Sequence, residues 1–318
     1  MQSLGRLIRF LSFVVEILLI FVAVIFWDFH QSAQNPKIVA VGQGSAVKIL
    51  SSLGTGARFG KTHARLLSLY GGAKTGELEL SSENLPKYRF LYELAHAKPV
   101  MNEIKLIPGE TTIVFLQNLA KSRALSFEIL ESEYNATAPF YEGFLVPETY
   151  KINKNENEKN IIKILSASAN KFHAEFREKH CADCNDTAYK EALIKASIIQ
   201  KEAANADEMP IVASVIENRL KIGMRLQMDG TLNYGLYSHT RVTPVRIRTD
   251  TSHYNTYLND GLPHEPVCVV SPNAIKAVFA PASTEFLYFM RNKKTGLHDF
   301  AKTQAEHERN VRAARNAK

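Results

Sequence analysis

The sequence has little cysteine, the residue on which many structural zinc sites and redox sites depend. It contains only three cysteines in 318 residues. Cys181 and Cys184 form a Cys-Ala-Asp-Cys pair, and a second ligand pair of the kind a structural zinc site needs is missing, apart from the isolated His173 and His180. In an oxidising compartment this spacing favours a local disulfide, with Cys268 as a buried free thiol. We expect no metal ion and no other cofactor.

Signatures of several common protein classes are also missing. There is no His-Glu-x-x-His, no serine nucleophile elbow and no phosphate-binding glycine loop. The net charge of +7 is spread along the chain, without a zinc finger, a recognition helix or an aromatic-interleaved basic motif. Nucleic acid is therefore not an expected partner. The basic surface suits an anionic membrane face or a carboxylate-rich polymer.

A long apolar segment is present near the N-terminus. From Phe10 to Trp27 only two residues are polar, and this length is sufficient to cross a hydrocarbon core of about 30 Å. Arg6 and Arg9 precede the segment, so the positive-inside rule places the short N-terminus in the cytoplasm and the rest of the chain across the membrane. The competing interpretation is a cleaved signal peptide, which the length of the segment and the lack of a clear Ala-x-Ala site disfavour.

The most informative stretch predicts a pair of helices. Apolar residues recur at three- and four-residue steps from Tyr189 to Ala203, which is the period of one face of an α-helix. The acidic residues and the proline at 207–210 predict the start of a second helix, which Gly223 is placed to end. Because the link between the helices is short, we expect a hairpin that sets Glu202 close to the loop after Gly223.

Glu202 is the candidate acid of this hairpin. It follows Ile198 and Ile199 by one turn, so its carboxyl group would lie between the apolar face and solvent. Partial desolvation there favours the protonated form that general acid catalysis needs. The alternative is a solvated helix-end glutamate paired with Lys195 or Lys201, which is the commoner role of a glutamate in such a place.

The rest of the chain predicts a mixture of helices and strands. In the first part we expect a strand at 39–44, helices at 46–53, 63–69 and 113–119, and strand and turn structure at 88–94 and 105–112. In the later part we expect helices at 161–176, from 271 and at 303–314, and a strand at 286–290.

Polar and aromatic side chains gather in three loop segments. Residues 142–150, 226–235 and 254–263 combine carboxylate or amide groups with aromatic rings. Such groups hydrogen-bond sugar hydroxyls and pack against sugar rings. Any one of these residues alone is more often part of a capped turn, but their concentration around the Glu202 hairpin favours a binding cleft.

Six sequence blocks together resemble one enzyme family. The blocks are Glu-Gly-Phe-Leu-Val-Pro-Glu-Thr-Tyr (142–150), Ala-Ser-Ile-Ile-Gln-Lys-Glu-Ala (196–203), the segment 215–231, Tyr-Asn-Thr-Tyr (254–257), Gly-Leu-Pro (261–263) and His-Asp-Phe-Ala-Lys-Thr-Gln-Ala-Glu-His (298–307). In residues, order and spacing they resemble the endolytic murein transglycosylases, the YceG-like or MltG family. The resemblance covers residues 39–318.

The resemblance implies a specific reaction without a cofactor. A family member cleaves the β-1,4 bond between N-acetylmuramic acid and N-acetylglucosamine in nascent peptidoglycan, leaves a 1,6-anhydro-muramic end, and so terminates glycan elongation. The family's catalytic glutamate falls on Glu202. Other motif positions are expected in or near the substrate cleft: Gln227, Asp229, Asn218, Tyr254, Asn255 and Glu142. Arg241, Arg246 and Arg248 would then meet the carboxylates of the peptide stems.

The sequence departs from the family pattern in two places. Met228 and Gly230 stand where the family usually has serine and proline. Residues 264–273 replace the Pro-Gly-Pro-Ile-x-Asn-Pro-Gly pattern that usually follows Gly-Leu-Pro. These departures concern the conformation of the loops and the detail of the subsites rather than the reaction.

The implied fold class is α+β. It comprises a cytoplasmic N-terminus (1–9), a single transmembrane helix (10–30), a linker (31–38), a small LysM-like α+β subdomain (39–131) and a mixed, helix-rich α+β catalytic domain (132–318). This domain would lie on the periplasmic side of the inner membrane, with peptidoglycan strands, the membrane and peptidoglycan synthases (penicillin-binding proteins) as partners. Two alternatives stay open: a hydrolytic muramidase with Asp229 or Glu142 as second carboxylate, and a non-catalytic scaffold that binds the wall.

Overall fold

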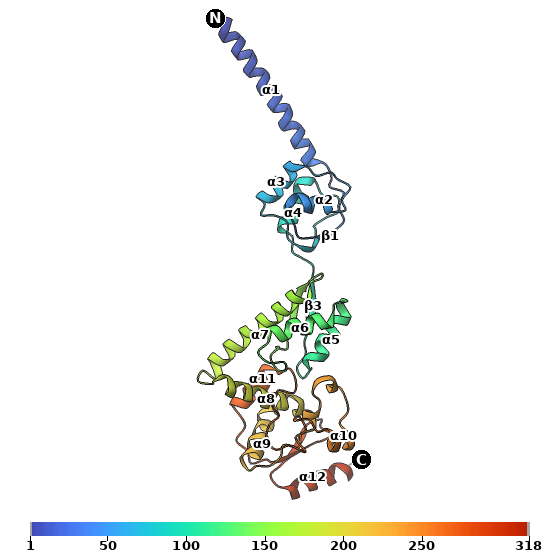
Figure 1. Ribbon diagram of the computed structural model, residues 1–318, viewed down its shortest axis with the longest axis vertical. Helices are drawn as coiled ribbons and strands as arrows, with labels where there is room; N and C mark the ends of the chain where they lie inside the picture. Colours follow the sequence, from blue (N-terminus) through green and yellow to red (C-terminus); the bar gives the residue numbers. More distant parts are fainter. Residues whose placement is uncertain (1, 317–318) are drawn as a thin grey trace. The chain divides into compact units, whose positions relative to one another are not determined.

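The computed structural model describes residues 2–316 and divides into two compact units (Figure 1). The first unit extends to residue 102 and also includes 151–156, and the second comprises 103–150 and the chain from 157 onward. Each unit has a hydrophobic core of its own. β3 (Met101–Lys105) and β4 (Thr149–Asn153) form a two-stranded sheet.

The first unit begins with one long apolar helix, α1 (Gln2–His30). An 18-residue window within Ile8–His30 has a mean hydropathy of 2.8, and the large apolar side chains of this part are mostly exposed. The length and composition are sufficient to cross a membrane, and a signal sequence near an N-terminus would have the same properties. The predicted apolar helix is therefore confirmed.

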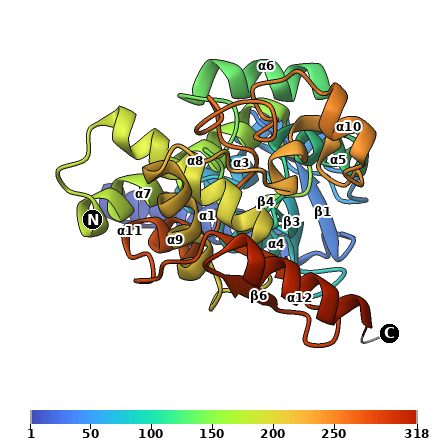
Figure 2. The same cartoon turned by 90° about the horizontal axis from the view of Figure 1, so that it is seen from below.

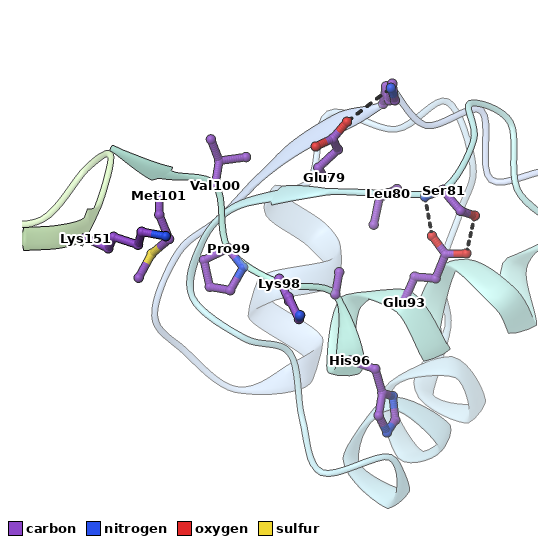
Figure 3. Close-up of a pocket in the computed structure, with 12 residues that line it drawn as sticks. Glu79, Leu80, Ser81, Glu93, His96, Lys98, Pro99, Val100, Met101 and Lys151 are labelled. Atoms are coloured by element: carbon purple, nitrogen blue, oxygen red, sulfur yellow. Dashed lines mark hydrogen bonds and ion pairs between the residues drawn. The ribbon is translucent and has the colours of Figure 1, made fainter. Parts of the chain in front are cut away.

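Two strands and three short helices form the rest of the first unit. β1 (Ile38–Val41) pairs antiparallel with β2 (Gly76–Glu79), with Val39 opposite Leu78. The helices are α2 (Ala46–Ser52), α3 (Lys61–Leu69) and α4 (Lys87–His96). They contribute Leu50, Leu67 and Phe90 to a core that includes the inward side chains of both strands. The end of β2 and the last turn of α4 border an open cleft (Figure 3).

One prediction was wrong in this unit. Residues 88–94, expected as strand and turn, lie within helix α4. Phe90, Leu91 and Leu94 recur at helical spacing and are fully buried. A short apolar run fits either period, and packing on the strand pair decides for the helix.

The end of α1 is bound to this folded module. Asp28 Oδ1 accepts a hydrogen bond from Lys87 Nζ at 2.5 Å, and Asp28 Oδ2 lies 3.3 Å from His63 Nε2. The ring centroids of Phe29 and His63 lie 4.4 Å apart, and those of His30 and Tyr88 lie 5.0 Å apart. The apolar helix therefore joins the module through α3 and the first residues of α4.

The second unit is rich in helices. They are α5 (Thr112–Arg123), α6 (Phe127–Thr137), α7 (Glu158–His180), α8 (Asp186–Glu202), α9 (Met209–Lys221), α10 (Pro244–Thr249), α11 (Pro272–Phe279) and α12 (Gln304–Asn316). Two short 3-10 helices, η1 (Asp229–Leu232) and η2 (Gly235–Tyr237), follow α9. Antiparallel β5 (Tyr288–Arg291) and β6 (His298–Ala301) precede α12, which lies beside β6 (Figure 2). The mixed, helix-rich α+β class is confirmed.

The predicted helical hairpin forms the centre of the second core. α8 and α9 pack on each other, and α11 packs on both. Ile198 and Ile199 of α8 and Val212 of α9 are fully buried, and burial of each such side chain contributes roughly 1.5–3 kcal/mol. Gly223 follows α9 in the left-handed region at φ +69°, where glycine is least strained. The hairpin prediction is confirmed.

The predicted domain boundary between residues 131 and 132 lies inside α6. Leu130 and Tyr134 of this helix are fully buried, and α6 packs against α7. The structure groups α5 and α6 with the second unit because their apolar faces are covered there.

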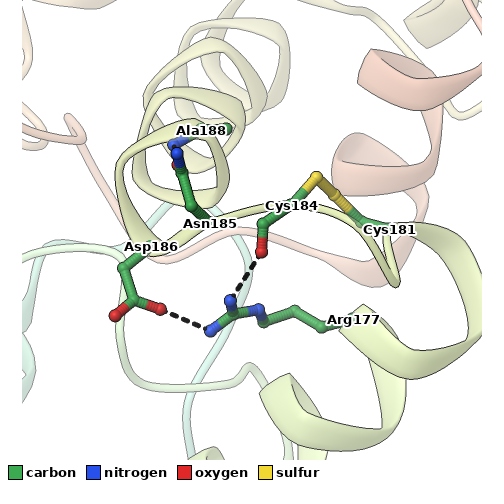
Figure 4. The surroundings of a disulfide bond; sticks show 6 residues. All are labelled: Arg177, Cys181, Cys184, Asn185, Asp186 and Ala188. Atoms are coloured by element: carbon green, nitrogen blue, oxygen red, sulfur yellow. Dashed lines mark hydrogen bonds and ion pairs between the residues drawn. A yellow bond between two sulfur atoms is a disulfide. The ribbon is translucent and has the colours of Figure 1, made fainter.

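A disulfide joins Cys181 and Cys184 in the loop between α7 and α8 (Figure 4). This is the local pairing that the spacing favours. Cys268 is buried and unpaired, as predicted. Burial raises the pKa of its thiol, so it stays protonated and unreactive.

The disulfide loop is also held by side-chain hydrogen bonds (Figure 4). Arg177 donates to Asp186 Oδ1 and to the carbonyl oxygen of Cys184, both at 2.8 Å. Asn185 caps α8 by accepting a hydrogen bond from the backbone N–H of Ala188 at 2.8 Å. These contacts define where α8 begins, and α8 ends at Glu202.

Candidate active site

Glu202 is the last residue of α8 and is half-buried. Its Oε1 accepts a hydrogen bond from the backbone N–H of Gly230 at 2.6 Å. Gly230 lies in η1, in the loop that follows Gly223. The structure therefore confirms that the hairpin brings Glu202 against this loop.

Gly230 makes this approach sterically possible. A Cβ at this position would lie 2.6 Å from the Cβ of Lys201 and 2.7 Å from Glu202 Oε1. Real Cβ atoms do not approach other atoms so closely, because the repulsion would displace one of the two segments. The lack of a side chain at Gly230 lets the backbone of the loop contact the carboxyl group directly.

The surroundings of Glu202 raise the pKa of its carboxyl group to about 7. Burial is the largest cause, because it disfavours the charged form. The hydrogen bond from Gly230 and the charge of Arg219 act in the opposite direction, and the charge of Asp229 raises the pKa further. A carboxyl group with this pKa can donate a proton and accept one near neutral pH.

The alternative of an ordinary ion pair is not realised. Lys195 Nζ lies 3.1 Å from Glu191 and 2.8 Å from Glu217. Lys201 Nζ donates to Ser238 Oγ at 3.3 Å. Both lysines that might have neutralised Glu202 are thus engaged elsewhere.

Asp229 lies beside this carboxyl group and is fixed by a tyrosine. The hydroxyl of Tyr257 donates to Asp229 Oδ1 at 2.6 Å. Burial, this hydrogen bond and the charges of Asp229 and Glu202 all raise the pKa of Tyr257, so its hydroxyl stays protonated. Sequence reasoning selected Tyr254 and Asn255 from the Tyr-Asn-Thr-Tyr motif and missed Tyr257, although the motif offered two tyrosines.

Backbone and threonine contacts hold the Asp229 loop in place. The N–H of Gln227 donates to Thr256 O and the N–H of Met228 donates to Thr256 Oγ1, both at 3.1 Å. Thr231 Oγ1 lies 3.1 Å from Thr256 Oγ1. Thr256 is almost completely buried, so it joins the loop of Asp229 to the motif of Tyr257.

Arg219 is a second residue that sequence reasoning did not select. It is buried at the end of α9, and its guanidinium donates to the carbonyl oxygens of Leu287 and Leu226. Its charge lowers the pKa of Glu202. The sequence shows it only as one charged residue on the polar side of a helix, because its burial depends on the later β5 segment.

Gln227 and Tyr254 present side chains that remain available. Gln227 is exposed and adopts the left-handed conformation at φ +47°, which is uncommon for a residue with a side chain. Tyr254 is half-buried and stacks on Tyr234 with ring centroids 4.4 Å apart. Both lie on the segments that Thr256 joins.

Asn218 and Asn255 are committed to internal hydrogen bonds. Asn218 Nδ2 donates to the carbonyl oxygens of Thr284 and Phe286 at 2.9 and 3.0 Å. Asn255 is completely buried, and its Nδ2 donates to Ile247 O and Asp250 O at 2.9 and 2.7 Å. Its Oδ1 accepts from the N–H of Tyr257 at 3.1 Å. These bonds shape the loops around Glu202.

Glu142 is also an internal residue. It is buried and accepts hydrogen bonds from the backbone N–H and the hydroxyl of Thr112. Burial raises the pKa of Glu142 to about 8. Its observed contacts join the 142–150 segment to the start of α5 and do not include Glu202.

The three candidate arginines differ in availability. Arg246 lies over the ring of Tyr237, 3.8 Å from its centroid, and donates to Leu232 O. Arg241 and Arg248 are exposed, and within residues 2–316 neither has an ion-pair partner. In the same part of the chain, no group of three or more His, Cys, Asp or Glu side chains is arranged to hold a metal ion.

Comparisons with known proteins give related matches. The profile of the YceG-like family matches residues 42–313. The endolytic murein transglycosylase of Bacillus subtilis (strain 168) is 34% identical over 170 residues, which is 53% of this chain and 46% of that protein. The enzyme of the same name from Streptococcus pneumoniae serotype 2 (strain D39) is 29% identical over 186 residues, 56% of this chain and 33% of that protein.

The matched region spans less than half the length of these curated relatives. A crystal structure of a YceG-like protein from Listeria monocytogenes aligns with a TM-score of 0.57 and 24% identity, over 86% of this chain and 98% of that one. At this identity the likeness concerns the fold. Since the family profile covers most of the sequence, the chain belongs to the YceG-like family.

Proposed function

We propose that this protein is a membrane-anchored lytic transglycosylase that cleaves the glycan strands of peptidoglycan internally. The observation that carries the proposal is the state of Glu202, a half-buried carboxyl group with a pKa of about 7, held against Gly230. The names of the curated relatives support peptidoglycan as the substrate. The bond cleaved is the β-1,4 bond between N-acetylmuramic acid and N-acetylglucosamine in nascent strands, so the enzyme terminates glycan elongation.

In the proposed mechanism, one carboxyl group acts twice. Protonated Glu202 donates its proton to the glycosidic oxygen as the bond from this oxygen to the muramic C1 breaks, and positive charge develops on the muramic ring. The resulting carboxylate then removes the proton of the muramic C6 hydroxyl, whose oxygen bonds to C1. No water is consumed, and the product has a 1,6-anhydro ring.

The neighbours of Glu202 suit both steps. Before cleavage, burial and the negative charge of Asp229 favour the protonated acid. After cleavage, the N–H of Gly230 stabilises the carboxylate. Asp229, oriented by Tyr257, also places negative charge near the site where positive charge develops on the sugar. We assign substrate contacts to the exposed side chains of Gln227, Arg241 and Arg248 and to the ring of Tyr254.

The N-terminal part supports an anchored enzyme. The apolar helix at Ile8–His30 would anchor the chain in the inner membrane, with Arg6 and Arg9 on the cytoplasmic side and both folded units outside. We assign the first unit to the LysM-like module of the resemblance. Peptidoglycan synthases are the proposed neighbours, because they produce the nascent strands.

The test is digestion of purified peptidoglycan by the full chain in detergent, with the new ends identified by mass spectrometry. We expect anhydro-muramic ends from the native chain and a loss of roughly 10²–10⁴-fold for Glu202→Gln, the range that acid–base catalysis typically contributes. Glu191→Gln is the matched control, because Glu191 is an exposed carboxylate on the same helix. Native-level activity of Glu202→Gln would contradict the proposal.

Asp229 supports one second candidate, a hydrolytic muramidase. Ordinary glycosidases use two carboxyl groups, and the charge of Asp229 acts on Glu202. Hydrolysis would leave reducing ends, heavier than anhydro ends by one water. The same digestion therefore distinguishes the two reactions, and the absence of any new ends would favour a non-catalytic scaffold.

A further inference from the structure

The first unit contains a cleft that the proposed chemistry does not use (Figure 3). Its volume is about 850 Å³. The end of β2, the last turn of α4, the segment 98–101 and Lys151 of β4 border it. All of these residues belong to the first unit.

The carboxylates of this cleft are already paired. Glu79 lies 3.1 Å from Lys37 Nζ. Glu93 accepts hydrogen bonds from the backbone N–H of Ser81 at 2.7 Å and from its hydroxyl at 2.5 Å, and it also pairs with Arg89 at 3.2 Å. Figure 3 shows the two hydrogen bonds between Ser81 and Glu93. Each of these acidic groups thus already has a cationic partner beside it.

The cations of the cleft include two that are free. Lys98 and Lys151 are exposed and line the cleft. In the part of the chain from residue 2 to 316, the structure gives neither ammonium group a hydrogen-bond or ion-pair partner. Uncommitted donors beside committed acceptors favour an anionic ligand, and a carboxylate accepts hydrogen bonds of the type that ammonium groups donate.

The wall between these lysines is apolar and is held by backbone contacts with β2. It consists of Pro99, Val100 and Met101, and 48% of the Met101 surface is exposed. The N–H of Val100 donates to Glu77 O at 2.6 Å, and Pro99 forms a β-bridge with Leu78. The wall is thus an added edge of the β1–β2 pair. It offers small apolar groups of a ligand a surface to contact, next to the cationic groups.

We propose that this cleft binds the peptide stem of a peptidoglycan strand through its carboxylates, with the alanine methyl groups of the stem against Pro99, Val100 and Met101. The inference rests on the function proposed above, because it assumes the same polymer as ligand. It gives the anchored unit a contact with the substrate that is separate from Glu202. Binding at a second point raises the effective concentration of the strand at the first.

Lipid headgroups share the anionic chemistry but fit the position less well. The apolar helix α1 is bound to Lys87 and Tyr88 at the start of α4, and the cleft lies at the last turn of this ten-residue helix. Ten residues of helix span about 15 Å, so the cleft and the residues that hold α1 lie at opposite ends of α4. The stem peptide is therefore the favoured ligand.

The test is co-sedimentation of the full chain with purified sacculi in detergent. All variants carry Glu202→Gln, so that cleavage does not alter the sacculi. We expect Lys98→Glu with Lys151→Glu to bind at least tenfold more weakly, because two attractive contacts become repulsive. Lys48→Glu with Lys61→Glu is the matched control, since both lysines are exposed in the same unit and lie outside the cleft.

Two further measurements test which ligand the cleft binds. Free stem pentapeptide should displace the chain from sacculi, and glycerol phosphate at the same concentration should not. Lys98→Arg with Lys151→Arg should retain binding, because the charge is kept. The proposal is wrong if the variant with Lys98→Glu and Lys151→Glu binds sacculi as tightly as the control with Lys48→Glu and Lys61→Glu. It is also wrong if glycerol phosphate displaces the chain and the peptide does not.

The outcome is separable from that of the proposed function. Binding is measured on the Glu202→Gln background, whereas anhydro-muramic ends are measured with Glu202 intact. If binding depends on Lys98 and Lys151 and no new ends are found, the cleft assignment holds and the transglycosylase assignment fails. If anhydro-muramic ends form and the variant with Lys98→Glu and Lys151→Glu binds sacculi normally, the transglycosylase assignment holds and the cleft assignment fails.

Discussion

The backbone N–H of Gly230 lies 2.6 Å from Glu202 Oε1 and donates a hydrogen bond to it. This bond favours the carboxylate, whereas burial of the same group favours the protonated acid. The pKa of about 7 results from both effects and from the charges of Asp229 and Arg219. Changes at Gly230 and Asp229 should therefore move the pH dependence of activity in opposite directions.

Gly230→Pro tests the hydrogen bond from the backbone N–H of Gly230. Proline removes this donor, and any Cβ added here has no room beside Lys201 and Glu202, so activity should fall. We expect the basic limb of the pH–rate profile to lie about one pH unit higher in Gly230→Pro than in the native chain, since hydrogen bonds to charged groups contribute roughly 1.5 kcal/mol or more. A basic limb that coincides with that of the native chain would show that this bond does not set the pKa of Glu202.

Asp229→Asn should shift the same limb towards lower pH. The negative charge of Asp229 raises the pKa of Glu202, so its removal makes Glu202 lose its proton at lower pH and leaves less acid at pH 7. Asp183→Asn is the control, because Asp183 is an exposed aspartate on the disulfide loop and changes the net charge equally. The measurement is the rate of anhydro-end formation from pH 5 to 9. A shift of the same size in both variants would contradict a local effect.

Glu142→Gln should remove part of the pH dependence of stability. Burial raises the pKa of Glu142 to about 8 from an ordinary value of 4.5, so the folded protein holds this proton more tightly than the unfolded chain. Its contribution to stability is complete below pH 4.5 and is lost as the pH rises through 8. From pH 4.5 to above pH 8 this loss is on the order of 5 kcal/mol. Urea unfolding followed by circular dichroism should show a smaller decline for Glu142→Gln than for the native chain or for the exposed control Glu175→Gln.

Asn255→Ala should act mainly through stability. The substitution leaves the part-buried carbonyl oxygens of Ile247 and Asp250 without their side-chain donor, which costs up to about 1–3 kcal/mol for each group that stays unsatisfied. We expect a lower midpoint of thermal unfolding, with Asn273→Ala unchanged because Asn273 is exposed on α11. Native stability combined with a raised KM for peptidoglycan would instead make Asn255 a substrate contact.

Local signals in the sequence predict the hairpin and its ends well. The period of α8, Pro210 at the second position of α9 and Gly223 after α9 all act within a few residues, so they can be read without the fold. The interpretation of 88–94 as strand failed because an apolar run of that length is compatible with both periods, and tertiary packing selects helix α4.

The residues of the candidate site also fall into two groups, those that local sequence signals predict and those whose positions depend on the fold. The position of Glu202 next to the following loop could be predicted because it depends on one hairpin. Tyr257 and Arg219 could not be selected, since their positions depend on contacts with Asp229 and with the Leu287 segment, far away in the sequence. The reverse holds for Asn255, whose motif suggested a substrate contact while the fold uses its amide to hold carbonyl groups.

The chain passes between the two units at three points. The chain leaves the first unit after residue 102, returns to it at 151–156 and leaves it again. No single cut or truncation point therefore separates the two units, because every fragment that contains one complete unit also contains residues of the other. A gene rearrangement that exchanges everything before residue 103 would likewise leave behind residues 151–156 of the original unit, so the two parts are expected to be inherited together rather than shuffled as independent cassettes.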